Sequence, residues 1–177
     1  MFHCTERLLL RPAWPEDWQA LYSGIADEGV VRNLARAPWP YGQDDARSFV
    51  ELPVDPRFPR FLITRSRDAA LIGCIGIDMT AGQVELGYWI ARQHWGRGYA
   101  TEAGRGVIEI ASALGYKTLV ASHFLDNPAS GKVLSKLGFK PTGRIVNRHS
   151  CGRGAEAPIA EYSLDLSEQS ADWETAA

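Results

Sequence analysis

The sequence predicts an α/β domain with a mixed, mostly antiparallel central sheet flanked by helices. Three apolar segments, at 61–66, 71–79 and 84–91, follow one another with short turns between them, which is typical of an antiparallel meander. The pattern then changes to a helix and a further strand at 118–124. A helix that joins two neighbouring strands makes their pairing locally parallel, so the two patterns together indicate one mixed sheet.

The segment before the meander supplies one strand and several short helices. Residues 7–13 are apolar and contain a late proline, which predicts a first strand. A helix is expected from Pro15, because acidic residues occupy its first turn and apolar residues recur at helical spacing, namely Trp18, Leu21, Tyr22 and Ile25. A short helix before Tyr41 then gives way to a proline-containing loop, and 44–52 is predicted as another short helix.

Two longer helices follow the meander. From Tyr99 to Gly115 the apolar residues step by three and four, the pattern of an amphipathic helix. The next helix carries complete end signals, with Asn127 as a cap, Pro128 at the first helical position and Gly138 as a left-handed terminator.

The end of the chain is predicted to form two strands, around 144–147 and 159–164, separated by a polar loop at 150–158. The final segment is acidic and rich in small residues, so fraying is expected there. We therefore predict one domain over 1–166 and an acidic C-terminal tail over 167–177.

Composition excludes several classes of function. The 177 residues carry 19 Lys and Arg against 21 Asp and Glu, a net charge of −2, which gives no overall attraction to nucleic acid or to an anionic membrane. No apolar stretch reaches the roughly 18 residues of a transmembrane helix. Three cysteines that are distant in sequence fit a reducing, cytoplasmic compartment. His149 and Cys151 lie close together, but two ligands do not make a metal site, and no metal is expected.

The turn before the Tyr99 helix has the composition of an anion cradle. Gly96 and Gly98 allow the backbone to turn tightly and to approach an anion, and the helix start offers unpaired N–H groups. Arg97 between them adds positive charge. The alternative is a tight strand-to-helix turn with no ligand. A Walker loop is absent from the sequence, and Thr101 stands where a dinucleotide fingerprint would need glycine.

Two segments in this order resemble the GNAT acetyltransferase superfamily: VELGYWIARQHWGRGYATEA at 84–103 and NPASGKVLSKLGF at 127–139. The opening TERLLLRPAWPEDW at 5–18 is similar to the branch of ribosomal-protein N-terminal acetyltransferases, RimJ and RimL. The resemblance extends over most of 5–165. It implies a GNAT-like fold whose sheet splays between the fourth and fifth predicted strands to hold acetyl-CoA.

The resemblance also implies which residues contact acetyl-CoA. Backbone N–H groups of the glycine turn would bind the diphosphate, and the end of the 84–91 strand would pair with the pantetheine arm. A polar pair at the start of the helix that follows Asn127 would lie near the arm and the sulfur. Lys132 and Lys136, one turn apart, either meet the 3′-phosphate or belong to a solvated face. The implied set is Trp89, Ile90, Ala91, Gln93, Trp95, Gly96, Arg97, Gly98, Tyr99, Ala100, Asn127, Ser130 and Lys132.

The catalytic candidates are Glu85 and Ser130. Glu85 occupies a position where several GNAT enzymes place a general base, acting directly or through water, although a solvent-facing strand glutamate is the alternative. Ser130 is implied to lie near the sulfur, where it either contacts the cofactor or donates a proton. Many GNAT enzymes carry a tyrosine general acid four residues further on, whereas this chain has Leu134. The departing thiolate would therefore be protonated by Ser130 or by water, or would leave without a proton donor.

The sequence leaves the acceptor open. Trp39 and Tyr41, flanked by prolines, are candidate walls of an acceptor pocket together with Glu85. A basic segment at 144–153 is a candidate for recognising an acidic acceptor, while nucleic acid is disfavoured. The predicted function is acetyl transfer to a primary amine by direct attack, with a protein N-terminal α-amine first and a small-molecule amine second. A non-catalytic CoA-binding module is the third alternative, and a homodimer is left open.

Overall fold

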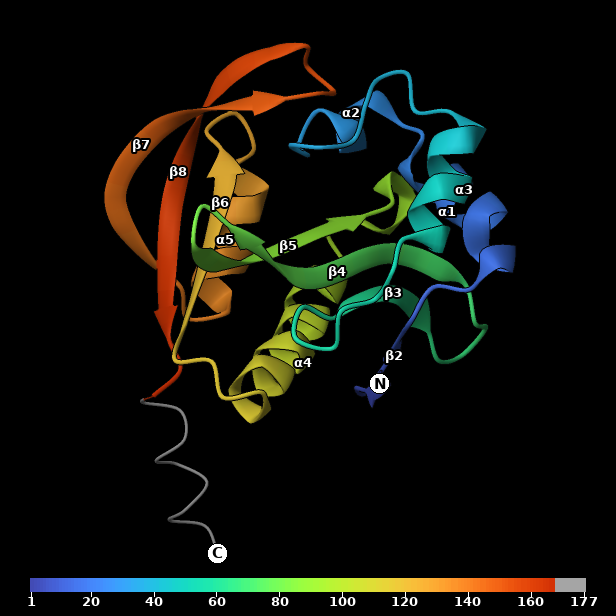
Figure 1. Ribbon diagram of the computed structural model, residues 1–177, viewed down its shortest axis with the longest axis horizontal. Coiled ribbons are helices and arrows are strands. Elements are labelled where there is room, and N and C mark those ends of the chain that lie inside the picture. Colours follow the sequence, from blue (N-terminus) through green and yellow to red (C-terminus); the bar gives the residue numbers. More distant parts are fainter. Residues whose placement is uncertain (168–177) are drawn as a thin grey trace, which may run out of the picture.

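The computed structural model describes residues 1–167 as one sheet with helices on both of its faces (Figure 1). The strands are β1 (His3–Cys4), β2 (Leu8–Arg11), β3 (Arg60–Arg65), β4 (Leu71–Thr80), β5 (Gln83–Ile90), β6 (Thr118–Phe124), β7 (Lys140–Ser150) and β8 (Ala155–Asp165). The α-helices are α1 (Trp18–Ile25), α2 (Glu28–Val31), α3 (Gln43–Glu51), α4 (Tyr99–Ala113) and α5 (Pro128–Lys136), with 3-10 turns η1 (Pro15–Asp17) and η2 (Arg92–His94).

The predicted meander is confirmed. The order of strands is β1-β2-β3-β4-β5-β6-β8-β7, and every neighbouring pair is antiparallel except β5 and β6. Thr80 of β4 pairs with Gln83 of β5, so the two strands join through the turn Ala81–Gly82. Both turn residues have positive φ, of 48° and 80°, as a two-residue hairpin turn with the twist of the sheet requires.

The sheet opens between β5 and β6. These parallel strands pair only at Glu85 and Val120. Beyond that point β5 crosses the molecule while β6 turns away with β8 and β7 (Figure 1). The splay expected between the fourth and fifth predicted strands is therefore present, and it leaves the end of β5 without a strand partner on one side.

Separate cores hold the helices to the two faces of the sheet. One contains α4 and α5 and buries Leu86, Ile90 and Val107. The other contains α1, α2 and α3 and buries Leu21, Val31 and Trp89. Because side chains alternate along a strand, β5 contributes to both cores, and both layers are fixed against the strand at the opening.

The structure corrects three boundaries. β1 was not predicted, since two residues carry no periodicity. β7 and β8 extend well beyond the predicted 144–147 and 159–164, and the loop at 150–158 shrinks to a turn at 151–154, because Ala155–Pro158 pair with Asn147–Ser150. β7 is an edge strand with mostly exposed polar residues, so it lacks the apolar alternation on which the prediction depended.

Apart from Ser167, the predicted tail at 167–177 lies outside the described residues, and the boundary at 166 stays a prediction. Within the described range, no helix combines the length and the apolar character that crossing a membrane requires.

Candidate active site

The turn that precedes α4 contains two glycines in the left-handed region. Gly96 and Gly98 have φ values of +72° and +80°, which residues with a Cβ rarely adopt. Gly98 is the N-cap of α4, so the first N–H groups of the helix lack intrahelical partners. A Cβ built at Gly96 meets nothing within 4 Å, which shows that the space beside the turn is open. An anion in that space would meet backbone donors and the positive end of the helix dipole.

The segment between β1 and β2 anchors this turn through Glu102, in the first turn of α4. Its carboxylate accepts hydrogen bonds from Thr5 Oγ1 and from Arg7 Nε, both at 2.6 Å. Arg7 Nη1 also donates to the carbonyl of Arg97, between the two glycines, at 3.2 Å. Burial raises the pKa of Glu102, but the donors from Thr5 and Arg7 outweigh it and hold the pKa below its usual value. The TER sequence at 5–7 therefore serves to fix the turn.

Three cations near the turn have no ion-pair partner among the residues that the structure describes. Arg97, Lys132 and Lys136 all line the same cavity. Within residues 1–167 none of them forms an ion pair. Open backbone donors together with unpaired cations fit a ligand that carries several phosphates.

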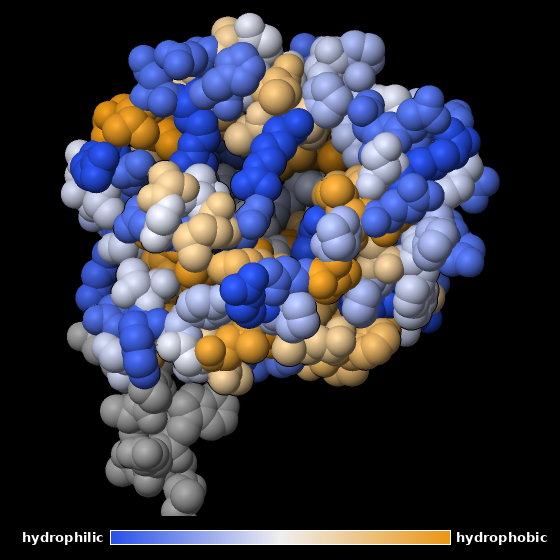
Figure 2. Space-filling model, viewed as in Figure 1, coloured by the Kyte–Doolittle hydropathy of each residue, from blue (hydrophilic) through white to orange (hydrophobic). Residues whose placement is uncertain are grey.

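A cavity of about 1330 Å³ passes from this turn through the opening in the sheet to the α1–α3 side. Figure 2 shows the hollow near the centre of this face, with hydrophobic and hydrophilic residues together at its mouth. Most of the residues implied by the resemblance line it: Trp89, Ile90, Trp95, Gly96, Arg97, Gly98, Tyr99, Ala100, Asn127, Ser130 and Lys132.

Three predicted contacts do not line the cavity: Ala91, Gln93 and Trp39. The backbone N–H of Ala91 donates to Ile72 at 2.8 Å, so it is already paired within the sheet. Trp39 is 41% exposed, whereas Tyr41 is buried and lines the cavity, as does Trp89. The aromatic residues that line the cavity therefore include Tyr41 but not Trp39.

Glu85 lies where β5 and β6 last pair, and its carboxylate is held by two donors. Its Oε1 accepts from Arg148 Nη1 at 2.7 Å and from Ser122 Oγ at 2.9 Å. Among residues 1–167, no donor contacts Oε2. The side chain is only 14% exposed and lines the cavity. Glu85 therefore has one oxygen fixed by the protein and one free to accept a proton or a hydrogen bond.

The basic segment at 144–153 is neutralised within the chain. Arg148 pairs with Glu85, Arg144 with Glu161 at 3.2 Å, and Arg153 with Asp126 at 2.8 Å. These pairs are specific to the fold, since each joins β7 or its turn to a residue distant in sequence. The segment is thus a structural part of the site and not a free basic patch.

The tip of the β7–β8 hairpin is fastened to the segment after α2. Ser150 Oγ donates to the carbonyl of Leu34 at 2.7 Å, and the N–H of Cys151 donates to that of Ala35 at 2.9 Å. Arg153 Nε adds a bond to the carbonyl of Arg32 at 2.7 Å. The hairpin therefore connects the β6–β8–β7 part of the sheet with the segment after α2, at the top of Figure 1.

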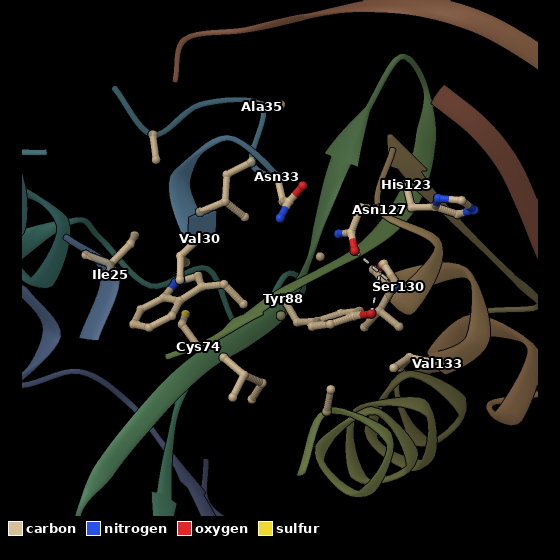
Figure 3. A pocket seen from close by; sticks show the side chains of 18 of the residues that line it. Ile25, Val30, Asn33, Ala35, Cys74, Tyr88, His123, Asn127, Ser130 and Val133 are labelled. Atoms are coloured by element: carbon tan, nitrogen blue, oxygen red, sulfur yellow. Dashed lines mark hydrogen bonds between the residues drawn. The ribbon is translucent and has the colours of Figure 1, made fainter. Parts of the chain in front are cut away.

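Tyr88 is among the polar residues of the cavity that sequence reasoning missed. Tyr88 extends from β5 to the start of α5, where its hydroxyl lies 2.8 Å from Ser130 Oγ, beside Asn127 (Figure 3). Asn127 caps α5, with its side chain accepting from the N–H of Ser130 at 3.4 Å. Tyr88 lies on the same strand face as the buried Leu86 and Ile90, so nothing in the local pattern marks its hydroxyl as part of a site. Among the described residues, no cluster of three or more His, Cys, Asp or Glu side chains suits a metal ion.

Fold and site together define an α/β domain whose opened sheet holds a cavity suited to a phosphate-bearing ligand. A family model of the acetyltransferase (GNAT) domain matches residues 7–140. The chain is 32% identical over 174 residues to the uncharacterized N-acetyltransferase YoaA of Bacillus subtilis (strain 168), covering 90% of this chain and 94% of that one.

Solved structures agree in fold. A GNAT-family acetyltransferase from Bacillus anthracis superposes with a TM-score of 0.82 at 21% identity, covering 94% of this chain and 99% of that one. RimL, a ribosomal L7/L12 alpha-N-protein acetyltransferase in complex with coenzyme A, gives 0.75 at 17% identity, with 93% and 98% covered. The chain therefore belongs to the GNAT acetyltransferase family, and it is an acetyl-CoA-dependent N-acetyltransferase.

Proposed function

We propose that the acceptor is the free α-amino group at the N-terminus of a peptide or protein, as in the RimJ/RimL-like branch. The likeness of residues 5–18 to that branch and the fold shared with RimL support this choice. The observation that carries the proposal is the state of Glu85, whose Oε1 is occupied by Arg148 and Ser122 while Oε2 accepts nothing from residues 1–167.

The chemistry of the amine explains why this state favours an α-amine. An α-amino group has a pKa of about 8, so roughly a tenth of it is neutral at pH 7, whereas a lysine side chain near 10.4 is neutral less than about one part in a thousand. A carboxylate with a single free oxygen, already engaged by an arginine, suits a nucleophile that is partly neutral before it binds. A lysine side chain is almost fully protonated at pH 7, so it needs a stronger base to remove its proton before it attacks.

The cavity accounts for the donor substrate. In the proposed arrangement the backbone from Trp95 to Ala100 binds the diphosphate, with Arg97 and Lys132 as charge partners. The end of β5 at Trp89 and Ile90 lies along the pantetheine arm, and Asn127 and Ser130 lie by the sulfur. Ala91 and Gln93 flank these positions without lining the cavity. Bound acetyl-CoA supplies an activated thioester, and the chain orients the amine toward it.

The proposed reaction is direct attack without an acetylated enzyme. The Oε2 oxygen of Glu85, directly or through a water, receives the proton that the amine nitrogen loses. Gly87 lies two residues after Glu85, on the same face of β5, and has no side chain. A Cβ at this position would meet nothing within 4 Å, so the cavity is open there. The amine can therefore approach close to the strand.

A small-molecule amine is the second candidate. The observation that favours it is the fastened hairpin tip, because the bonds from Ser150 and Cys151 to Leu34 and Ala35 restrict access from that side. Access restricted on that side would admit a small amine or an extended N-terminus more readily than a lysine on a folded surface.

The test is acceptor-dependent release of free thiol from acetyl-CoA across matched amines. The panel contains peptides with free N-termini, the same peptides with blocked N-termini and a free lysine, polyamines and small primary amines. We expect release with free N-termini and little with blocked lysine peptides. Release confined to small amines would replace the proposed acceptor with the second candidate, and release with lysine peptides alone would contradict both.

A further inference from the structure

The helix that carries Ser130 offers no acid at the position where many relatives have a tyrosine. Leu134 occupies that position and is 1% exposed, within the core shared by α4 and α5. A leucine cannot donate a hydrogen bond, so negative charge that develops on a departing sulfur has no donor from this position. Another group of the chain has to supply one, or water does so alone.

Tyr88 places a phenol at the same helix from the opposite side of the opening. Its hydroxyl and Ser130 Oγ are 2.8 Å apart, and both residues line the cavity. Figure 3 shows the ring extending from β5 across to the first turn of α5. Within the described part of the chain neither hydroxyl has another side-chain or backbone partner for its oxygen. The two form an isolated pair at the wall of the cavity.

The direction of this hydrogen bond decides what the pair can do. If Ser130 donates to Tyr88, the serine hydrogen is consumed inside the wall. If the phenol donates to Ser130 Oγ, the serine hydrogen is free to point into the cavity. A phenol is a stronger donor than an aliphatic hydroxyl, so the second direction is favoured whenever an acceptor with negative charge lies beside Ser130.

We propose that Tyr88 is a positioning residue for acetyl transfer: its phenol donates to Ser130 Oγ and thereby fixes the Ser130 hydroxyl as the hydrogen-bond donor to the departing sulfur. This inference rests on the proposed placement of acetyl-CoA in the cavity. Tyr88 then fulfils from β5, through Ser130, part of the role that Leu134 cannot fulfil from α5.

The step balances without the loss of a proton from the phenol. The acceptor nitrogen forms a bond to the acetyl carbon while the bond from that carbon to sulfur breaks, with its electron pair left on sulfur. One proton leaves the nitrogen for Glu85 or water, and one proton reaches the sulfur from solvent. Burial raises the pKa of Tyr88, with the bond to Ser130 opposing it in part, so the phenol remains a protonated donor across the neutral range.

The test uses binding of CoA itself, which requires no acceptor. A donor to the sulfur favours the thiolate, so the affinity for CoA rises with pH through the titration of its thiol, relative to desthio-CoA, which lacks the sulfur. Calorimetry from pH 6.5 to about 9 measures this rise. We expect Tyr88→Phe and Ser130→Ala each to make this rise in CoA affinity about tenfold smaller. The double variant should reduce the rise no further than Ser130→Ala alone.

Tyr162→Phe is the matched control. Tyr162 is also partly buried and also contacts a side chain, with its hydroxyl 3.4 Å from His123 Nε2, but it does not line the cavity. The Tyr162→Phe variant should leave the pH dependence of the CoA affinity unchanged. A pH dependence in Tyr88→Phe equal to that of the wild type overturns the proposal. Should Tyr88→Phe fail to fold, a wild-type pH dependence in Ser130→Ala overturns it equally.

Kinetics separate this inference from the proposed function. With an accepted amine, Tyr88→Phe should lower kcat about tenfold with acetyl-CoA, and much less with the acetyl selenoester of CoA, whose selenol leaves without help. An equal loss with both donors overturns the positioning role. If no amine is acetylated while the pH dependence of CoA binding is present, the proposed acceptor chemistry fails and the Tyr88 inference stands.

Discussion

A substitution at Gly98 tests the cradle most sharply, because the chain provides a matched control at the other end of the same helix. Gly98 and Gly115 have φ values of +80° and +87°. A Cβ at Gly98 would meet only Arg7 Nη2, at an ordinary 3.5 Å, and one at Gly115 would meet nothing within 4 Å. Any other residue in this left-handed region costs about 1–2 kcal/mol. Each substitution should therefore lower the melting temperature by roughly 2–8 °C.

The two sites differ in what a carboxylate would meet. Gly98→Glu places negative charge beside the bound diphosphate, while Gly115→Glu places it in solvent. Two like unit charges about 4 Å apart repel by about 1 kcal/mol in water and about 4 kcal/mol at the effective dielectric of a protein surface. Affinity for acetyl-CoA should fall about 5-fold to about 1,000-fold in Gly98→Glu.

Calorimetric titration with acetyl-CoA measures the difference, and thermal unfolding of the same samples verifies that the strain is matched. Gly98→Ala separates strain from charge, since it carries the first without the second. The reasoning is refuted if Gly98→Glu and Gly115→Glu bind acetyl-CoA equally well.

Three further predictions concern the proposed base Glu85, the open strand position Gly87 and the ion pair of Asp126 with Arg153 at the β7–β8 hairpin. Glu85→Gln should lower kcat most at low pH, where less amine is neutral, with unchanged acetyl-CoA affinity; an unaltered pH–rate profile would return Glu85 to a structural role. Gly87→Leu, which meets no strain, should raise the acceptor KM roughly tenfold and leave acetyl-CoA binding intact, and an unchanged KM would place the acceptor elsewhere. Hydrogen bonds from Arg153 hold the pKa of Asp126 below its ordinary 3.8, so the carboxylate stabilises the fold above that pH and loses this effect as pH falls through the lower folded value. Urea unfolding of Asp126→Asn should therefore show a stability deficit at pH 7 that closes in acid; a deficit independent of pH would exclude the ion pair as its cause.

Local signals in the sequence were sufficient for the parts of the fold that they govern. The turn at Ala81–Gly82 and the cap of α5 at Asn127 were predicted, because each depends on a few adjacent residues. The terminator Gly138 likewise has a φ of +89°. β7 was underestimated because it is held by pairing with β8, not by burial of its own side chains.

The site also contains features that adjacent residues determine and features that depend on the whole fold. The positive φ of Gly96 and Gly98 follows from their place before a helix, so it was predictable. The contact of Arg148 with Glu85 joins residues 63 positions apart and depends on the order of the strands, in which β7 pairs with β8 and β8 with β6. No local signal distinguishes Tyr88 from its strand neighbours, and only the position of α5 shows that its hydroxyl meets Ser130. Pair contacts across strands carry no local signature, and the sequence alone could not supply them.

The central claim is that acetyl-CoA bound in this cavity delivers its acetyl group directly to an amine. A single-turnover experiment tests it, with enzyme in excess over acetyl-CoA, an accepted amine added, and both amine and intact protein followed by mass spectrometry after rapid quenching. The account predicts that the acetyl group appears on the amine as acetyl-CoA disappears, without acetylated protein at any time. Acetylated protein that forms before the amine product and decays into it would contradict direct transfer.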